Sequence, residues 1–209
     1  MNPLSHQHIL ESLSQPLIEQ GYFVKDDLFL PDIINNLLQF AHQKYEYGEF
    51  KKAAVGRQLK KTKIDSIRGD EIQWIENWSE AESLNTYGLF LEQFLDALRV
   101  NLRIPLKRYE GHFAYYPIGK HYVRHIDQHA KTQHRQVTCI MYLSDWEPEN
   151  QGELIMYLPD GSQLEVAPKA GRFVCFLSGL IPHEVKTTQA PRWSITSWMR
   201  DDLVDFLPF

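Results

Sequence analysis

A histidine and an aspartate stand two residues apart in the middle of this chain, and their types suit metal chemistry. His125 and Asp127 follow a run rich in aromatic and β-branched residues. In an extended strand, residues i and i+2 point to the same face, so both side chains can face one metal ion. The chain has nine histidines among 209 residues, so the pair alone is equally compatible with a solvated strand edge.

A third ligand is available closer to the C-terminus. His183 lies in a short apolar segment between Pro182 and Val185. Two imidazoles and one carboxylate bind Fe(II) in non-haem oxygenases and leave coordination positions open. By itself, His183 is also compatible with a buried histidine that bonds to the backbone. Together, the three residues predict an iron site.

A positively charged residue, Arg192, follows His183 in a segment whose alternating side chains predict a strand. One face of this strand is predicted to carry Arg192, Ser194, Thr196 and Trp198. An arginine buried without an anion is strongly unfavourable, and its planar fork suits a carboxylate. The anion is either an acidic side chain or a ligand carboxylate. Beside a predicted iron site, we favour the ligand.

Length and composition indicate one ordinary soluble globular domain. The 24.6 kDa chain has a net charge of −5, which argues against non-specific nucleic-acid binding. It lacks an apolar run of the length that spans a bilayer, about 20 residues, and it lacks a signal-peptide pattern at Met1. Cys139 and Cys175 lie in apolar runs and are expected to be core residues. We therefore expect a cytoplasmic protein with neither nucleic-acid nor membrane partners; no heptad pattern predicts its oligomeric state.

The hydrophobic periodicity changes near Pro105, from helical spacing to short alternating runs. Helices are expected over 5–20, after Pro31, and after Ser79 as the N-cap. Strands are expected near 107–116, 121–126, 135–143, 153–158, 162–166, 172–177, 182–188 and 192–199. This order predicts an α+β fold with a mainly β core: a double-stranded β-helix (jelly roll, cupin-like) with the N-terminal helices packed on one sheet.

The same residues carry a resemblance to a known family. The order His125-x-Asp127, His183, Arg192-x-Ser194 resembles the 2-oxoglutarate-dependent Fe(II) dioxygenases, and within them the prolyl hydroxylases of the hypoxia-inducible-factor (PHD or EGLN) type and their bacterial relatives. The likeness spans roughly residues 65–200. Its further matching segments are Ile67 to Asp70 with Ile72 and Trp74, Tyr116-Pro117, Tyr122 to Arg124, Val137 to Ile140, Tyr142-Leu143, Pro182 to Val185 and Trp193 to Trp198.

The resemblance implies one domain over 1–209, with helical support and a mobile loop in 1–104 and a jelly-roll catalytic core in 105–200. It implies Fe(II), 2-oxoglutarate and O2 as cofactors, with ascorbate supportive. The implied iron ligands are His125, Asp127 and His183. The implied 2-oxoglutarate pocket comprises Arg192 for the C5 carboxylate, Tyr142, Thr196, Leu154 beside the aliphatic stem, and Tyr116 near the iron. The implied substrate side comprises Arg68, Asp70, Tyr122 and Trp198, with residues 48–65 as a lid.

The implied activity is hydroxylation of a prolyl residue in a protein, coupled to conversion of 2-oxoglutarate to succinate and CO2. For a bacterial source, a translation factor such as elongation factor Tu is the candidate substrate. A hydroxylase of a free amino acid or another small molecule is the main alternative, and a non-catalytic metal- or 2-oxoglutarate-binding module is another.

Other members of the superfamily match less well. Trp198 stands where nucleic-acid demethylases typically have a second arginine, and Arg192 stands where collagen-type prolyl hydroxylases usually have lysine. The chain also departs from the animal enzymes, with a shorter turn at Ile118-Gly119, Glu153 after Gly152 where a second glycine is familiar, and little sequence after the last strand. These departures concern the substrate more than the iron site.

Overall fold

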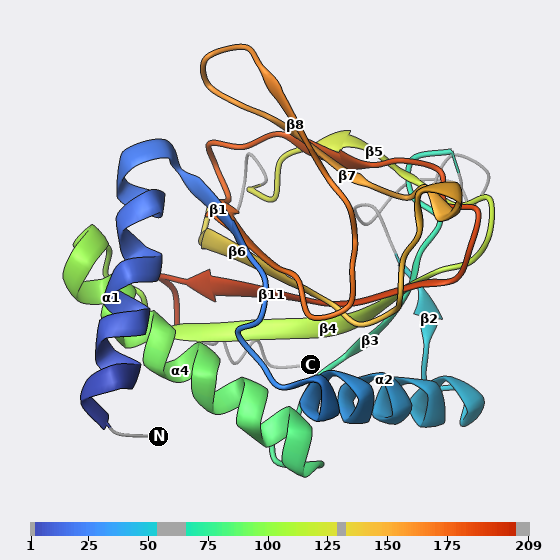
Figure 1. Ribbon diagram of the computed structural model, residues 1–209, viewed down its shortest axis with the longest axis horizontal. Coiled ribbons are helices and arrows are strands. Elements are labelled where there is room, and N and C mark those ends of the chain that lie inside the picture. Colours follow the sequence, from blue (N-terminus) through green and yellow to red (C-terminus); the bar gives the residue numbers. More distant parts are fainter. Residues whose placement is uncertain (1–2, 54–65, 129–132, 204–209) are drawn as a thin grey trace.

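In the described part of the chain, two antiparallel β-sheets face each other, and α-helices cover the outer side of the larger sheet (Figure 1). This computed structural model describes residues 3–53, 66–128 and 133–203. The helices are α1 (Pro3–Gln20), α2 (Pro31–Glu46) and α4 (Glu82–Leu102), with a short 3-10 helix η1 (Pro148–Asn150). None of the described helices is long and apolar enough to cross a membrane.

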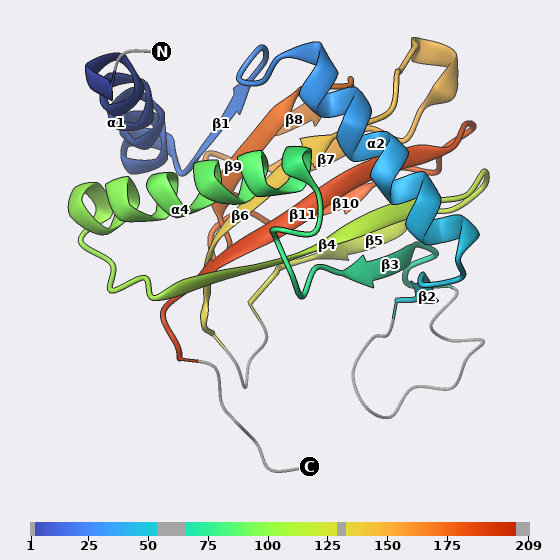
Figure 2. The same ribbon diagram turned by 90° about the horizontal axis from the view of Figure 1, so that it is seen from below.

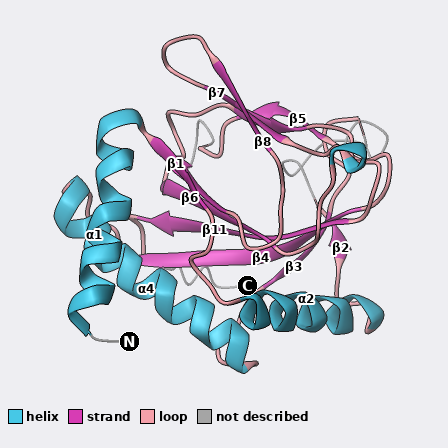
Figure 3. Cartoon of the chain, viewed as in Figure 1, coloured by secondary structure: helices cyan, strands magenta, loops and turns pink. Residues whose placement is uncertain are grey.

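The larger sheet has seven strands in the order β1-β9-β6-β11-β4-β3-β2. Its strands are β1 (Tyr22–Lys25), β2 (Lys51–Lys52), β3 (Glu71–Trp74), β4 (Arg108–Tyr116), β6 (Arg135–Tyr142), β9 (Phe173–Leu177) and β11 (Arg192–Arg200). The smaller sheet has the order β5-β10-β7-β8. Its strands are β5 (Tyr122–His125), β7 (Leu154–Tyr157), β8 (Gln163–Val166) and β10 (His183–Val185). This arrangement confirms the predicted jelly roll with helices on one sheet (Figure 3).

Strand alternation separates a helix-facing core from the space between the sheets. On β11, Trp193 and Ile195 are buried in the core that the helices share with the larger sheet, whereas Ser194 faces the opposite way and lines a pocket. Helix α4 contributes Leu91 and Phe94 to the same core. Seen from below, α1, α2 and α4 lie across this face of the sheet (Figure 2). One face of β11 therefore packs in the core beneath the helices, and its other face lines the pocket.

The second helix follows the expected local rules. Pro31 is its first residue and Asp32 lies in its first turn, where a fixed φ and a negative charge are favourable. Its apolar stripe places Ile34, Leu37 and Ala41 in the core. After α2, the chain continues to β2 at the edge of the larger sheet.

All eight strands expected beyond Pro105 are present, but one expectation about the first half was wrong. Ala81, not Ser79, is the N-cap of α4, because Ser79 lies in a turn where its N–H bonds to Asn77. The first half also contributes β1, β2 and β3 to the larger sheet. In the expected 48–65 loop, Lys51–Lys52 pairs with β3, and residues 54–65 lie outside the described residues.

The helix-facing core makes a stability prediction. Leu91→Ala should lower the free energy of unfolding by about 2–5 kcal/mol, since a fully buried side chain leaves a cavity. Leu89→Ala is the matched control on the same helix: its side chain is 48% exposed, so a change within about 0.5 kcal/mol is expected. Urea unfolding followed by circular dichroism measures both. Equal losses would contradict the described packing of α4.

Candidate active site

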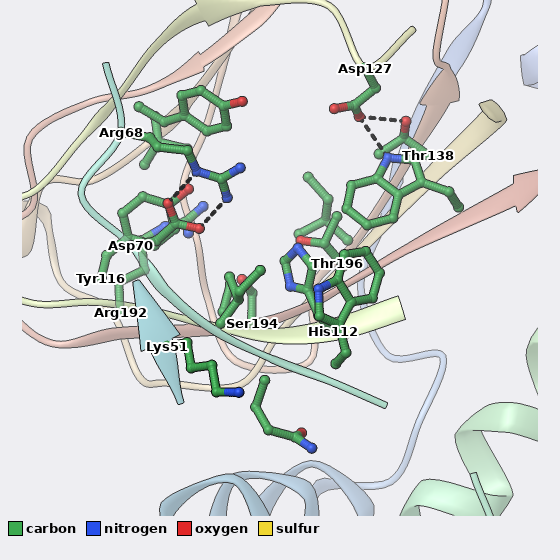
Figure 4. A pocket seen from close by; sticks show the side chains of 18 of the residues that line it. Lys51, Arg68, Asp70, His112, Tyr116, Asp127, Thr138, Arg192, Ser194 and Thr196 are labelled. Atoms are coloured by element: carbon green, nitrogen blue, oxygen red, sulfur yellow. Dashed lines mark hydrogen bonds and ion pairs between the residues drawn. The ribbon is translucent and has the colours of Figure 1, made fainter. Parts of the chain in front are cut away.

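A pocket of about 930 Å³ lies between the two sheets. Its floor consists of pocket-facing residues of β3, β4, β6 and β11, and its roof of residues from β5, β7 and β10. Most of the side chains predicted from the sequence to be functional line this space. Figure 4 shows six of them, Arg68, Asp70, Tyr116, Asp127, Arg192 and Thr196.

Two histidines meet at paired strand ends in the roof. His125 is the last residue of β5 and His183 the first of β10, and the two are direct partners in the antiparallel register. Their ring centroids are 4.3 Å apart. Asp127 Oδ1 lies 3.7 Å from His125 Nε2, and Asp127 Oδ2 lies 3.8 Å from His183 Nε2. These separations exceed hydrogen-bond length, and one ligand atom from each of the three residues lies within 4.8 Å of the others, so one metal ion fits between them.

Of the two residues, His125 lies on the strand predicted near 121–126, and Asp127 lies just beyond it. Strand β5 ends at His125, where its pairing with β10 ends, and Asp127 lies in the bend beyond. The carboxylate is positioned by side chains of the opposite sheet. Trp198 Nε1 and Thr138 Oγ1 donate hydrogen bonds to Asp127 Oδ2, at 3.0 and 2.8 Å.

The hydrogen bonds of the two histidines set the ring tautomer that a metal needs. Nδ1 of His125 lies 2.9 Å from the Val123 carbonyl oxygen, and Nδ1 of His183 lies 3.1 Å from the Ile181 carbonyl oxygen. Because a carbonyl only accepts, each Nδ1 must carry the proton, which leaves the Nε2 lone pair free. Tyr122 stacks on the His125 ring with centroids 3.6 Å apart and so fixes its orientation.

Burial sets the protonation of the same groups. Burial, reinforced by His183, lowers the pKa of His125 to about 4, so this imidazole is neutral at pH 7. Burial acts to raise the pKa of Asp127, but the two imidazoles and the Trp198 hydrogen bond outweigh it, and the pKa falls to about 2. A neutral imidazole and an ionised carboxylate are the forms that bind metal.

At the other end of the pocket, Arg192 is buried without an acidic partner among the described residues. Its guanidinium carbon lies 5.0 Å from the Tyr116 ring centroid and 4.9 Å from that of Tyr142. Arg192 Nε and the Tyr142 hydroxyl are both buried without a hydrogen-bond partner. Such a cradle demands an anion, because a lone buried charge is strongly unfavourable.

Gly152 shapes this cradle. Its φ is +77°, and a Cβ there would come within 3.0 Å of Thr188 and 3.3 Å of the Arg192 side chain. The position next to it, Glu153, is buried with its carboxylate 3.6 Å from Lys186 Nζ. Glu153 therefore pairs with Lys186, and the glycine leaves room for Arg192.

The other arginines on the pocket wall are neutralised. Arg68 forms a two-pronged ion pair with buried Asp70, and its guanidinium lies 4.4 Å from the Tyr122 ring centroid. Arg135 pairs with Glu110. Among the described pocket-lining arginines, Arg192 alone is left to bind an anionic ligand.

Of the residues predicted from the sequence, all but one line this pocket. Tyr142 is the exception: it is fully buried and packs beside Arg192. Leu154 and Thr196 line the pocket, as do Tyr122 and Trp198. The arrangement places three residues that can hold a metal ion in the same pocket as a buried cation that suits a carboxylate.

Comparisons with known proteins agree with this chemistry. Residues 111–200 match the family model of the 2OG-Fe(II) oxygenase superfamily. A crystal structure of a Pseudomonas putida prolyl-4-hydroxylase is 34% identical, with a TM-score of 0.85, and the match covers 92% of this chain and 99% of that one. Egl nine homolog 1 of Mus musculus is 32% identical over 206 residues, covering 92% of this chain and 50% of that protein.

The chain belongs to the 2OG-Fe(II) oxygenase superfamily. A Trichoplax adhaerens prolyl hydroxylase, solved with a hypoxia-inducible-factor peptide fragment, shares the fold at 24% identity with a TM-score of 0.87, covering 95% of this chain and 91% of that one. The oxygenase spans about half the length of the Egl nine homologues that it matches.

Membership places the chain among the Fe(II)- and 2-oxoglutarate-dependent dioxygenases, which use Fe(II), 2-oxoglutarate and O2. The residues of this oxygenase fit both groups: the histidine tautomers suit a metal ion, and the unpartnered Arg192 and Tyr142 atoms suit a carboxylate.

Sequence reasoning missed Thr138 as a contributor to the site. It lies on β6, and its hydroxyl contacts both Asp127 and Ser178. The signal was present in the alternation of the strand, because Thr138 shares the pocket-facing side with Ile140, whereas Cys139 faces the helix-side core.

Thr138→Val should weaken metal binding about 10–100-fold, because Asp127 loses one of the two donors that orient it. Anaerobic titration with Fe(II), or with Mn(II) as a redox-stable probe, measures the affinity. Thr86→Val is the matched control, since its hydroxyl bonds to a helix carbonyl on α4. Unchanged metal affinity in Thr138→Val would contradict the positioning role.

Proposed function

We propose that this oxygenase hydroxylates a prolyl residue in a protein substrate, using Fe(II), 2-oxoglutarate and O2. One observation carries the cofactor assignment: a buried arginine without an acidic partner shares a pocket with a His-Asp-His triad. A structural role for Arg192 would require a carboxylate beside it, and none of the described residues provides one.

His125, Asp127 and His183 would hold the iron. Arg192 would bind the C5 carboxylate of 2-oxoglutarate through its fork, with the Tyr142 hydroxyl as a further donor. When bound, iron and 2-oxoglutarate supply the oxidising chemistry, which converts 2-oxoglutarate and O2 to succinate and CO2 and transfers one oxygen atom to the substrate.

The walls of the pocket support the remaining cofactor roles. Leu154, on β7, would line the aliphatic stem of 2-oxoglutarate, and Thr196, on β11, would add a polar contact. Tyr116 covers one side of the Arg192 guanidinium. Burial raises the pKa of Tyr116 well above its usual value, so its hydroxyl stays protonated and can donate a hydrogen bond.

A prolyl substrate is supported by relatives whose names state prolyl hydroxylation, including the Pseudomonas putida enzyme at 34% identity. The substrate side would comprise the Arg68–Asp70 ion pair, Tyr122 stacked on His125, and Trp198. The pocket also extends to the edge strand β2, where Lys51 lines it, so it has room for more than a free amino acid (Figure 4).

We propose a reducing cytoplasm as the location, supported by two cysteines that remain free thiols with their sulfur atoms 3.6 Å apart. Ascorbate would support turnover by keeping the iron reduced. A translation factor, with elongation factor Tu as the first candidate, is our proposal for the protein substrate.

Arg192→Ala should weaken 2-oxoglutarate binding on the order of 10²–10³-fold, because a buried charge-assisted contact is lost. The 2-oxoglutarate affinity of Arg192→Lys should lie between those of wild type and Arg192→Ala, since lysine keeps the positive charge but lacks the planar fork of the guanidinium. Succinate formation from labelled 2-oxoglutarate, with Fe(II) and ascorbate, gives the KM of each variant. Arg124→Ala is the matched control, because Arg124 is exposed and stacks on Tyr157. Equal KM values in all four proteins would overturn the assignment.

Wild-type protein should add one oxygen atom to proline within an array of proline-containing peptides that includes segments of elongation factor Tu. His183→Ala should abolish the addition while keeping the native circular dichroism spectrum, since only a metal ligand is removed. Mass spectrometry after incubation in ¹⁸O₂ detects the product. Oxidation of free proline without oxidation of any peptide would favour the small-molecule alternative, and 2-oxoglutarate binding without any turnover would favour a binding module.

A further inference from the structure

The floor of the pocket carries a row of uncharged side chains that leads outward from the cofactor end. Thr196, His112 and Trp74 are direct neighbours in the register of β11, β4 and β3. Because β3 lies next to the edge strand β2, this row runs from the interior of the larger sheet toward its rim. Thr196, His112 and Trp74 all line the pocket.

His112 lies between two indole rings on this floor. Its ring centroid is 5.1 Å from Trp74 and 5.2 Å from Trp198, edge to face in both cases. Trp198 is held by its hydrogen bond to Asp127 and by Arg135, whose guanidinium carbon lies 3.6 Å from the ring centroid. Trp74 is 43% exposed, so one wall of this cluster is fixed and the other remains open to an incoming chain.

The imidazole of His112 has unmet hydrogen-bonding capacity. The residue is 4% exposed, and Nδ1 has no hydrogen-bond partner. Burial lowers the pKa of His112 to about 4, against the opposing attraction of Asp70, so the ring is neutral at pH 7. The faces of two indole rings do not replace a hydrogen bond to the ring nitrogen. A buried polar atom without a hydrogen-bond partner is uncommon in native proteins and often marks a functional position.

We propose that His112, Trp74 and Trp198 form a substrate subsite in which the imidazole hydrogen-bonds to a backbone peptide group next to the oxidised residue. The chemistry of the floor favours a peptide backbone. Thr196, His112 and Trp74 carry no charge, so they suit an uncharged polar group with apolar atoms on either side. The inference rests on the proposed function, because it requires a peptide in the pocket.

The test uses the proline-containing peptide with the highest turnover in the array. His112→Leu should raise the KM for this peptide about tenfold, the loss of one hydrogen bond, with little change in kcat. His112→Gln should recover part of the loss, since an amide can still bond to a backbone group. His42→Leu is the matched control, because His42 is exposed on α2 and lies outside the pocket.

A backbone scan separates a hydrogen bond from mere packing. Copies of the peptide that each carry one backbone ester lack one N–H and have a weaker acceptor. In wild type, one ester position next to the proline should raise KM, and in His112→Leu the same ester should have no further effect. The affinity for 2-oxoglutarate and the melting temperature of His112→Leu should match those of wild type.

Three results would overturn the subsite. An unchanged peptide KM in His112→Leu would remove His112 from substrate binding and leave the prolyl hydroxylase proposal intact. A weaker 2-oxoglutarate affinity or a lower melting temperature would assign His112 a structural role. Failure of wild type to oxidise any peptide would overturn the proposed function, and the subsite with it.

Discussion

The position of Asp127 depends on a contact between the two sheets. The residue lies beyond the end of β5, so no strand pairing places it. Trp198 on β11 and Thr138 on β6 reach it from the larger sheet and bind the same carboxylate oxygen. A buried carboxylate without donors would be costly, so the spacing between the sheets and the orientation of the carboxylate are set together. Asp127 therefore takes its place beside His125 and His183 through the packing of the two sheets against each other.

The helices contribute to the site indirectly. They bury the outer face of the larger sheet, including Trp193 and Ile195, and so keep β11 in place. On the inner face, the same strand then presents Arg192 at one end of the pocket and Trp198 at the other. Because Arg68 and Arg135 are paired with carboxylates, Arg192 is the one arginine of the described pocket wall without an acidic partner. An anion is therefore favoured beside Arg192, and a cation beside His125, Asp127 and His183.

Much of this arrangement follows from local patterns in the sequence. Period-2 alternation predicted all eight strands after Pro105 and the face on which Arg192, Ser194 and Thr196 lie. Residue chemistry identified the two histidines and the aspartate, since this donor set suits Fe(II) and Arg192 follows it closely in sequence. The family resemblance added the cofactor and the prolyl substrate, which residue types alone do not specify.

The tertiary structure decided what joins these parts. Trp198 and Asp127 are 71 residues apart in sequence, and their hydrogen bond depends on how closely the sheets pack. Strand β3 has four residues, too few to show alternation, and its pairing with β4 brings Trp74 beside His112. The sequence by itself determined the strands, the metal-binding residue types and the side of β11 that carries the cation, because these depend on local periodicity. The tertiary structure alone decided which donors hold Asp127, which pocket-lining arginine lacks an acidic partner and that His112 lines the pocket, because hydrogen bonds and charge pairing depend on distances between segments remote in the chain.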